Sequence, residues 1–228
     1  MPNWYLEQAS TYAGQIDNVI LIVLILAGIG FIAAEVLFFW LIWKFRASNG
    51  TPARYLQGKD GTDKTVKRWV TYPHFVILFF DVVIIVFSVI AWRNVKMVLP
   101  EADSEIRVIG QQWAWTFQHP GLDNELDTED DIFTVDELHI EVDKIYHFHL
   151  ESRDALHSFS VPVFRLKQDA IPGRSITGWF EATNTGEHDI QCAEICGIGH
   201  GVMRGRIHIE DANRHSEWLA ANSTGTIP

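Results

Sequence analysis

The chain has 228 residues, of which 47% are hydrophobic, and its formal net charge is −11. The hydrophobic share is high for a soluble protein, and the length allows one domain of ordinary size with a further segment. The acidic charge excludes nucleic acid as an expected partner.

The first apolar run covers residues 19–43, "VILIVLILAGIGFIAAEVLFFWLIW", and its one ionisable residue is Glu35. As a helix it is long enough to cross roughly 30 Å of hydrocarbon. The preceding residues have no positive segment and no small-residue cleavage pattern. The run is therefore predicted to be a retained membrane span and not a signal peptide.

A second apolar run, "FVILFFDVVIIVFSVIAW" at residues 75–92, carries only Asp81, and Trp69, Tyr72 and Trp92 near its ends are typical interfacial anchors. We predict a second span over about residues 73–93. Glu35, His74 and Asp81 are ionisable groups within or next to these spans, and we expect them to face a neighbouring subunit and pair there.

Basic residues indicate the orientation of this helical hairpin. The segment between the spans is rich in lysine and arginine, whereas residues 1–18 contain neither. The positive-inside bias puts the connecting loop in the cytoplasm and both chain ends outside. The basic residues of the loop are Lys44, Arg46, Arg54, Lys59, Lys64, Lys67 and Arg68.

The pattern changes after residue 98 to short alternating segments with Gly, Pro, Asn and Asp at the breaks. Strands are predicted in "EIRVIGQQWAWTF", "FTVDELHIEV", "KIYHFHLES", "HSFSVPVF", "SITGWFEAT" and "GRIHIE", with a solvated acidic loop at residues 122–131. The expected organisation is therefore a membrane-anchored segment, residues 1–98, followed by an external antiparallel sandwich or barrel, residues 99–228.

This external domain is strongly acidic. From residue 99 onward, 23 Asp and Glu stand against 9 Lys and Arg, a formal charge of −14. Solubility alone can account for much of this charge, but it would also attract a basic partner protein.

Both cysteines of the chain lie in "CAEICGIGHGVM", residues 192–203, between two predicted strands. A disulfide would use Cys192 and Cys196 only. A zinc site would add His200 and a remote histidine but would leave Met203 unused. A blue-copper site would take Cys196, His200 and Met203 with an earlier strand histidine, and the spare thiolate of Cys192 could bridge a second copper ion. The earlier histidine is expected at His157 in "DALHSFSVP", with His139, His147, His149, His188 and His208 as competitors.

Over nearly its whole length the sequence resembles subunit II of haem-copper cytochrome c oxidases, through the hairpin, "GQQWAWTF", "DALHSFSVPVFRLKQDAIPGR" and "CAEICGIGHGVM". The resemblance implies a cupredoxin-like sandwich with the two-copper centre called CuA. It implies Cys192 and Cys196 as bridging ligands, His157 and His200 as in-plane ligands, and Met203 and the backbone carbonyl of Glu194 as weak axial ligands.

The resemblance also implies that electrons enter at Trp113 from cytochrome c, and that the Glu194 side chain holds magnesium at the contact with subunit I. The function expected is then electron transfer through CuA to haem in subunit I, where dioxygen is reduced, in a bacterial-type plasma membrane or the mitochondrial inner membrane. A copper-free subunit of the quinol oxidase type and a disulfide-stapled anchored binding domain are the alternatives.

Two positions depart from the family pattern. Ala114 stands between the tryptophans where an aromatic residue is common, and Val66 stands where many members have the glutamate of a proton channel. We therefore do not predict that proton-channel role here. The chain also lacks a C-x-x-C-H haem-attachment motif, so the electron donor is expected to be a separate protein or domain.

Overall fold

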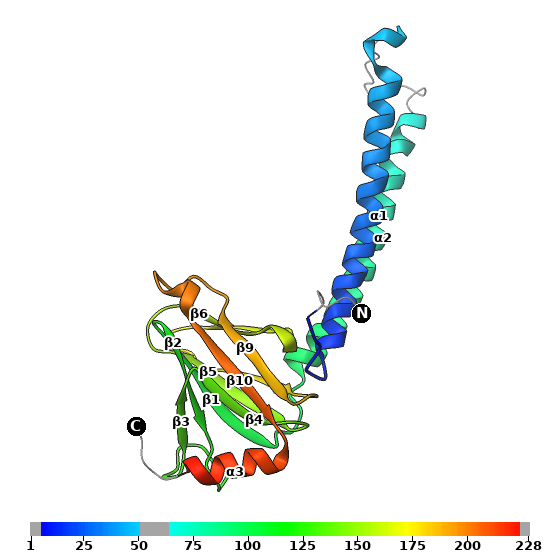
Figure 1. Cartoon of the computed structure of the whole chain (residues 1–228). Helices are drawn as coiled ribbons and strands as arrows, with labels where there is room; N and C mark the ends of the chain where they lie inside the picture. Colours follow the sequence, from blue (N-terminus) through cyan, green and yellow to red (C-terminus); the bar gives the residue numbers. More distant parts are fainter. Residues whose placement is uncertain (1–5, 51–63, 224–228) are drawn as a thin grey trace. The chain divides into compact units, whose positions relative to one another are not determined.

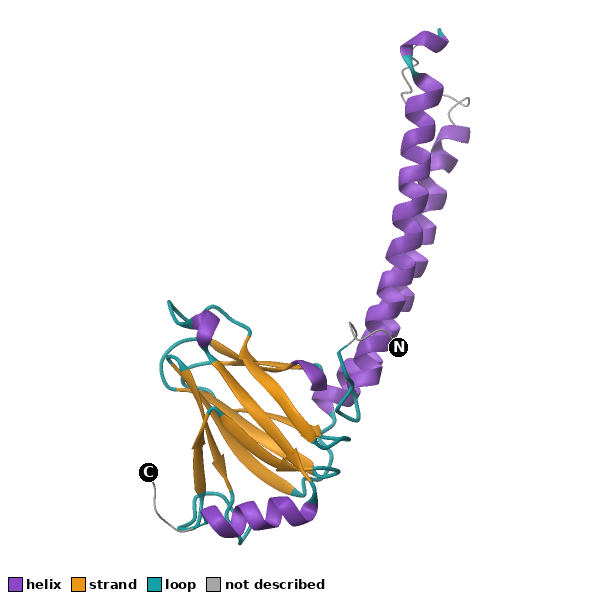
Figure 2. Cartoon of the chain, in the orientation of Figure 1, coloured by secondary structure: helices purple, strands orange, loops and turns teal. Residues whose placement is uncertain are grey.

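The computed structural model describes residues 6–50 and 64–223, and contains two long helices, two β-sheets and a C-terminal helix (Figures 1 and 2). These residues divide into two compact units. One unit runs over residues 17–92, and the other contains the residues that follow together with those up to Ile16.

Helices α1 (Ala13–Phe45) and α2 (Lys64–Trp92) are each long and apolar enough to cross a membrane, and α2 continues into a π-helical turn, Arg93–Met97. Both helices extend beyond the predicted spans, so Pro73 lies inside α2 and not at its start. Arg54 and Lys59 lie outside the described residues, and so do the side chains of Val66 and Trp69.

The external unit is a sandwich of two five-stranded sheets, with strand orders β3-β2-β1-β5-β8 and β4-β10-β9-β6-β7. The predicted fold class, a helical hairpin followed by a cupredoxin-like sandwich, is confirmed. The strands are β1 (Ser104–Gln111), β2 (Ala114–His119), β3 (Ile132–Val135), β4 (Glu137–Glu141), β5 (Ile145–Ser152), β6 (His157–Val161), β7 (Leu166–Ala170), β8 (Ile176–Glu181), β9 (Gly186–Cys192) and β10 (Arg204–Glu210).

The expectation of a wholly antiparallel sandwich was wrong. Strands β1 and β5 are parallel, and so are β4 and β10. The physical reason is the route of the chain, which leaves the first sheet after β3, passes through the second as β4, and returns beside β1 as β5 (Figure 1).

Two predicted strands are each divided in the structure. The stretch "EIRVIGQQWAWTF" forms the hairpin of β1 and β2, which turns at Gln112 and Trp113. The stretch "FTVDELHIEV" changes sheet at Asp136, whose φ of 61° is left-handed. A single residue of this conformation redirects the chain from β3 to β4.

The inner faces of the sheets form an aromatic and aliphatic core. Trp115, Phe117, Phe148, Phe159 and Phe180 are all fully buried, and the rings of Trp115 and Phe159 meet edge to face at 5.5 Å. Burial of such rings dominates the energetics of a small sandwich. The core therefore supplies a rigid base for the loops at its ends.

Residues before α1 also belong to the external unit, which the sequence did not indicate. Ser10 forms a bridge to Ala182, and its hydroxyl donates to the Phe164 carbonyl at 3.0 Å. Tyr12 is buried with its ring edge to face with that of Trp179, centroids 5.1 Å apart. The N-terminal segment is thus part of the packed external structure.

Candidate metal centre

The pairing of β6 with β9 brings the predicted upstream histidine to the cysteine loop. His157 is the first residue of β6, Cys192 is the last residue of β9, and the register sets Phe159 opposite Cys192. The backbone N–H of Cys192 donates to the Met203 carbonyl at 3.1 Å and closes the loop. Strand register thereby places His157 beside the loop although 35 residues separate it from Cys192.

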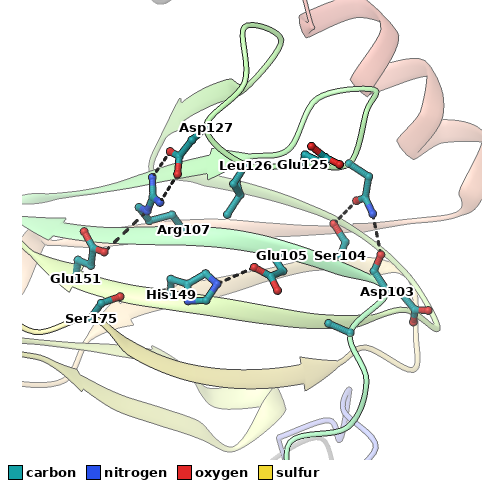
Figure 3. Close-up of a pocket in the computed structure, with 12 residues that line it drawn as sticks. Asp103, Ser104, Glu105, Arg107, Glu125, Leu126, Asp127, His149, Glu151 and Ser175 are labelled. Carbon is teal, nitrogen blue, oxygen red and sulfur yellow. Dashed lines mark hydrogen bonds and ion pairs between the residues drawn. The ribbon is translucent and has the colours of Figure 1, made fainter.

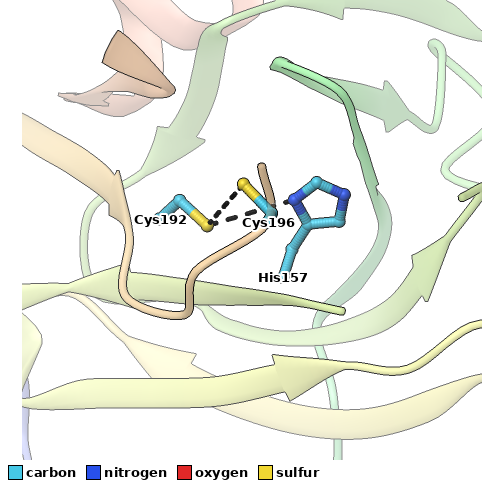
Figure 4. Close-up of side chains that lie close together, drawn as sticks. All are labelled: His157, Cys192 and Cys196. Carbon is cyan, nitrogen blue, oxygen red and sulfur yellow. Dashed lines mark hydrogen bonds between the residues drawn. The ribbon is translucent and has the colours of Figure 1, made fainter. Parts of the chain in front are cut away.

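Two sulfur atoms form the middle of the site. The Sγ atoms of Cys192 and Cys196 are 3.8 Å apart, and the Nδ1 atom of His157 faces them, 4.0 Å from Cys192 Sγ (Figure 4). His157, Cys192 and Cys196 are all buried. Their ligand atoms lie within 4.8 Å of one another.

The other predicted ligands, His200, Met203 and the Glu194 carbonyl, lie next to the two cysteine sulfurs. Cys196 Sγ lies 3.8 Å from His200 Nδ1 and 3.8 Å from Met203 Sδ. Cys192 Sγ lies 3.2 Å from the carbonyl oxygen of Glu194. Each sulfur therefore has one imidazole nitrogen and one weak donor beside it, an arrangement with approximate two-fold symmetry.

The chemistry of this donor set fits copper. Two thiols, two imidazoles and a thioether are soft or borderline ligands, which suit copper, whereas zinc has little use for a thioether. A separation of 3.8 Å lets both sulfurs bond to one ion, because a metal–sulfur bond is about 2.3 Å long. A disulfide bond would instead need about 2.05 Å, and both cysteines are free thiols in the structure.

Burial keeps the Cys196 thiol protonated when no metal is bound. Burial, together with the neighbouring Cys192, raises the pKa of Cys196 to about 11. Since metals bind the thiolate, loading of the site must release protons.

Asp154 and Gln112 support the site and were not singled out in the sequence. Asp154 Oδ1 lies 2.8 Å from His157 Nε2, the ring nitrogen on the side away from the thiols. Gln112 Nε2 donates to the Cys196 carbonyl at 2.7 Å. Asp154 stands three residues before His157, and this spacing is the one signal that the sequence offered.

Trp113 and Trp115 have separate environments in the structure. Trp115 lies in the core and packs against His157, with ring centroids 6.1 Å apart. Trp113 is 39% exposed, and its ring covers the loop, since a Cβ atom on Gly199 would overlap it. Trp113 lies in the turn before β2 and Trp115 lies inside that strand, so the two rings have different surroundings.

A pocket of the external domain lies away from these donors. It is a polar hollow on the outer face of the first sheet, where Arg107 pairs with Asp127 at 2.7 Å and His149 with Glu105 at 2.9 Å (Figure 3). None of its lining residues is a predicted copper ligand. The charged groups labelled there largely satisfy one another.

Comparison with known proteins identifies the external domain. Residues 104–210 match the family of cytochrome c oxidase subunit II periplasmic domains. The alternative cytochrome c oxidase subunit 2 of Bradyrhizobium diazoefficiens is 28% identical over 97% of this chain and 85% of its own length. The cytochrome c oxidase subunit 2 of Thermostichus vulcanus is 41% identical over 53% of this chain, but this match spans only 34% of that relative.

A solved structure resembles the same domain. The periplasmic domain of subunit II of the cytochrome oxidase of Bradyrhizobium japonicum superposes with a TM-score of 0.50 and 27% identity. The match covers 55% of this chain and 96% of the solved domain. It supports the cupredoxin-like architecture of the two sheets.

Proposed function

The chain belongs to the family of cytochrome c oxidase subunits II, and on this basis we propose that its external domain holds the two-copper centre CuA and relays electrons from cytochrome c to haem in subunit I. The observation that carries the proposal is the convergence of two thiols, two imidazoles, one thioether and one carbonyl at the end of the sandwich. When bound, the copper pair would accept and release one electron at a time.

The residues of the chain have distinct roles in this proposal. Cys192 and Cys196 would hold the copper pair through their thiolates, together with the imidazoles of His157 and His200. The Met203 thioether and the Glu194 carbonyl would be weaker ligands that tune the site. The protein ligands would leave no open position for substrate, as suits a relay and not a site of bond chemistry.

The surface around the loop supports docking of an electron donor. Trp113 lies over the loop, and Ile198 close by is 96% exposed. The external domain carries a formal charge of −14, with 23 acidic against 9 basic residues, which would attract a basic cytochrome c. We propose that electrons enter at Trp113.

Assembly with subunit I completes the proposal. The protein is membrane-anchored and has an external domain, and its family forms part of haem-copper oxidases. We propose that both apolar helices span the bilayer, with the domain on the periplasmic or equivalent side. The side chain of Glu194 would then hold magnesium at the contact with subunit I, which contains the dioxygen-reducing site.

The alternative functions lack comparable support. A copper-free subunit has no need for the converging donors, and a disulfide-stapled domain would not leave two free thiols. Met203 beside Cys196 also disfavours a zinc clip.

Metal analysis of the purified chain tests the proposal. We expect two copper ions per chain and the purple colour of a mixed-valence pair. One zinc ion and no colour would contradict it.

Substitution of single ligands tests the roles. His200→Ala should lose the mixed-valence spectrum, because it removes an in-plane donor, while Met203→Leu should keep both ions and change mainly the potential. His149→Gln, on the outer face of the other sheet, is the matched control and should behave as wild type. Loss of copper in Met203→Leu but not in His200→Ala would refute the assignment.

A further inference from the structure

A second group of metal-ligating side chains lies on the outer face of the sheet β4-β10-β9-β6-β7. Strands β4 and β10 are parallel, and their register sets His139 opposite His208. Leu138 and Ile207, the neighbours of these histidines, are buried in the core, so the histidines project from the other face. One ring nitrogen of each histidine and a carboxylate oxygen of Glu137 lie within 4.8 Å of one another.

A carboxylate lies beside the Nδ1 atom of each of these two histidines. The Nδ1 atom of His139 lies 3.3 Å from Glu210 Oε1, and the Nδ1 atom of His208 lies 3.5 Å from Glu187 Oε1. A carboxylate at one ring nitrogen is the usual outer-shell arrangement for a histidine whose other nitrogen binds a metal. In both residues this leaves Nε2 as the ligating nitrogen.

The Nε2 atom of His208 has an unsatisfied hydrogen-bonding capacity. It is buried, and among the described residues it has no hydrogen-bond partner. A buried polar atom without a partner costs about 1–3 kcal/mol, a cost that a metal ion bound at Nε2 would offset.

The carboxylate of Glu137 is the third candidate ligand, beside the two histidines. Arg206 is its register neighbour on β10, but the guanidinium of Arg206 pairs with Asp189 on β9 at 3.0 Å. Glu137 is exposed to solvent, whereas the two histidines are mostly buried. An ion could therefore reach the histidines from the side of Glu137.

Ring packing explains part of this cluster but not all of it. The His139 ring stacks on that of His208 with centroids 4.4 Å apart, and Trp218 of helix α3 (Ala212–Asn222) stacks on His139 at 4.2 Å. Stacking accounts for the position of the three rings. It gives no partner to His208 Nε2 and no role to the carboxylate of Glu137.

We propose that Glu137, His139 and His208 form a second metal site, which binds a divalent transition-metal ion such as zinc. Two imidazoles and one carboxylate, with one open position, are a ligand set typical of zinc. Tetrahedral bonds of about 2.1 Å require ligand atoms about 3.4 Å apart, so metal binding would turn the stacked rings of His139 and His208 toward a common point. His208 lies five residues after Met203 in the sequence, roughly 16 Å along a strand at about 3.3 Å per residue.

Calorimetric titration of the full-length chain in detergent with zinc chloride tests the proposal. The double variant Cys192→Ser/Cys196→Ser removes the thiols, so that the candidate copper centre loses its strongest ligands for zinc. We expect one zinc ion per chain in this background. Adding His208→Gln or Glu137→Gln should weaken binding at least ten-fold, whereas adding His149→Gln, another outer-face histidine with a glutamate partner, should not.

Copper(II) added to the same thiol-free protein gives an independent readout. Its electron paramagnetic resonance should report two imidazole ligands in the parent and one in His208→Gln. The Glu137 side chain is exposed, so Glu137→Gln should not disturb folding. A loss of binding in this variant therefore reports the loss of a ligand. Absence of zinc binding in the thiol-free parent would overturn the proposal, and so would equal affinities in Glu137→Gln and His149→Gln. Neither result depends on whether the thiol site binds copper.

Discussion

Asp154 links two parts of the candidate copper centre through one carboxylate. Its Oδ1 atom contacts His157 Nε2 at 2.8 Å, and its Oδ2 atom accepts from the backbone N–H of Gln112 at 2.7 Å. The first contact directs the Nδ1 lone pair of His157 toward the thiols. The second contact fixes the turn that carries Trp113.

We predict that Asp154→Ala weakens copper binding by about 10–100-fold, the usual effect of losing an outer-shell partner of a ligating histidine. Asp154→Asn should have a smaller effect, since the isosteric amide keeps one acceptor oxygen. Competition with a copper chelator measures the affinity, and the exposed Asp123→Asn is the control. An affinity of Asp154→Ala equal to that of the control would exclude this positioning role.

Single residues also show what the sequence could and could not reveal about the site. Cys192, Cys196, His200 and Met203 share one loop, so their spacing alone suggested a common site. His157 was favoured over the other strand histidines because it begins a predicted strand, and the family resemblance agreed, but the register of β6 on β9 that brings it to the loop is not readable from the sequence. The approach of His139 to His208 depends in the same way on parallel register.

At the scale of elements, the loop between β9 and β10 is shaped to fit under Trp113. A Cβ atom on Gly199 would overlap the Trp113 ring, whereas a Cβ atom on Gly201 would meet nothing within 4 Å. A methyl group would therefore overlap the indole at Gly199 and meet open space at Gly201.

Gly199→Ala should displace the Trp113 ring and slow electron transfer from reduced cytochrome c, while Gly201→Ala should leave the rate unchanged. Stopped-flow absorbance of the copper centre measures the rate, and the copper content of both variants should equal that of wild type. Equal rates in the two variants would argue against Trp113 as the point where electrons enter.

Elements with weak hydrophobic patterns were missed in the sequence. Strand β7 contains the polar run Lys167, Gln168 and Asp169, and helix α3 has a largely polar sequence around Trp218. Neither has the apolar periodicity that predicts an element. Both form because neighbours hold them, through pairing of β7 with β6 and stacking of Trp218 on His139.

At the scale of the whole molecule, buried histidines connect stability to pH. Burial lowers the pKa of His119 to about 3, and the nearby His139 and His215 act in the same direction. The unfolded chain takes up this proton near pH 6.5, whereas the folded protein does not. Stability must therefore fall as the pH decreases from about 6.5 toward 3.

We predict that His119→Gln makes the free energy of unfolding decrease less steeply with falling pH, by about 1 kcal/mol per pH unit. This is roughly the effect of one proton that only the unfolded chain binds. Glutamine retains a polar group for Thr134, which lies 3.2 Å from His119 Nε2. Denaturant unfolding of the full-length chain between pH 7 and pH 4.5 measures the slope. His149→Gln, which replaces a histidine on the outer face of the first sheet, is the control variant.

The hydrogen bond between Gln112 and Cys196 has a further consequence for the proposed electron relay. Trp113 is joined to Gln112 by a peptide bond, and Gln112 Nε2 contacts the Cys196 carbonyl at 2.7 Å. The indole and the Cys196 sulfur are thus connected by covalent bonds with a single hydrogen-bonded jump. For a tunnelling electron, such a route avoids any step through open space or solvent.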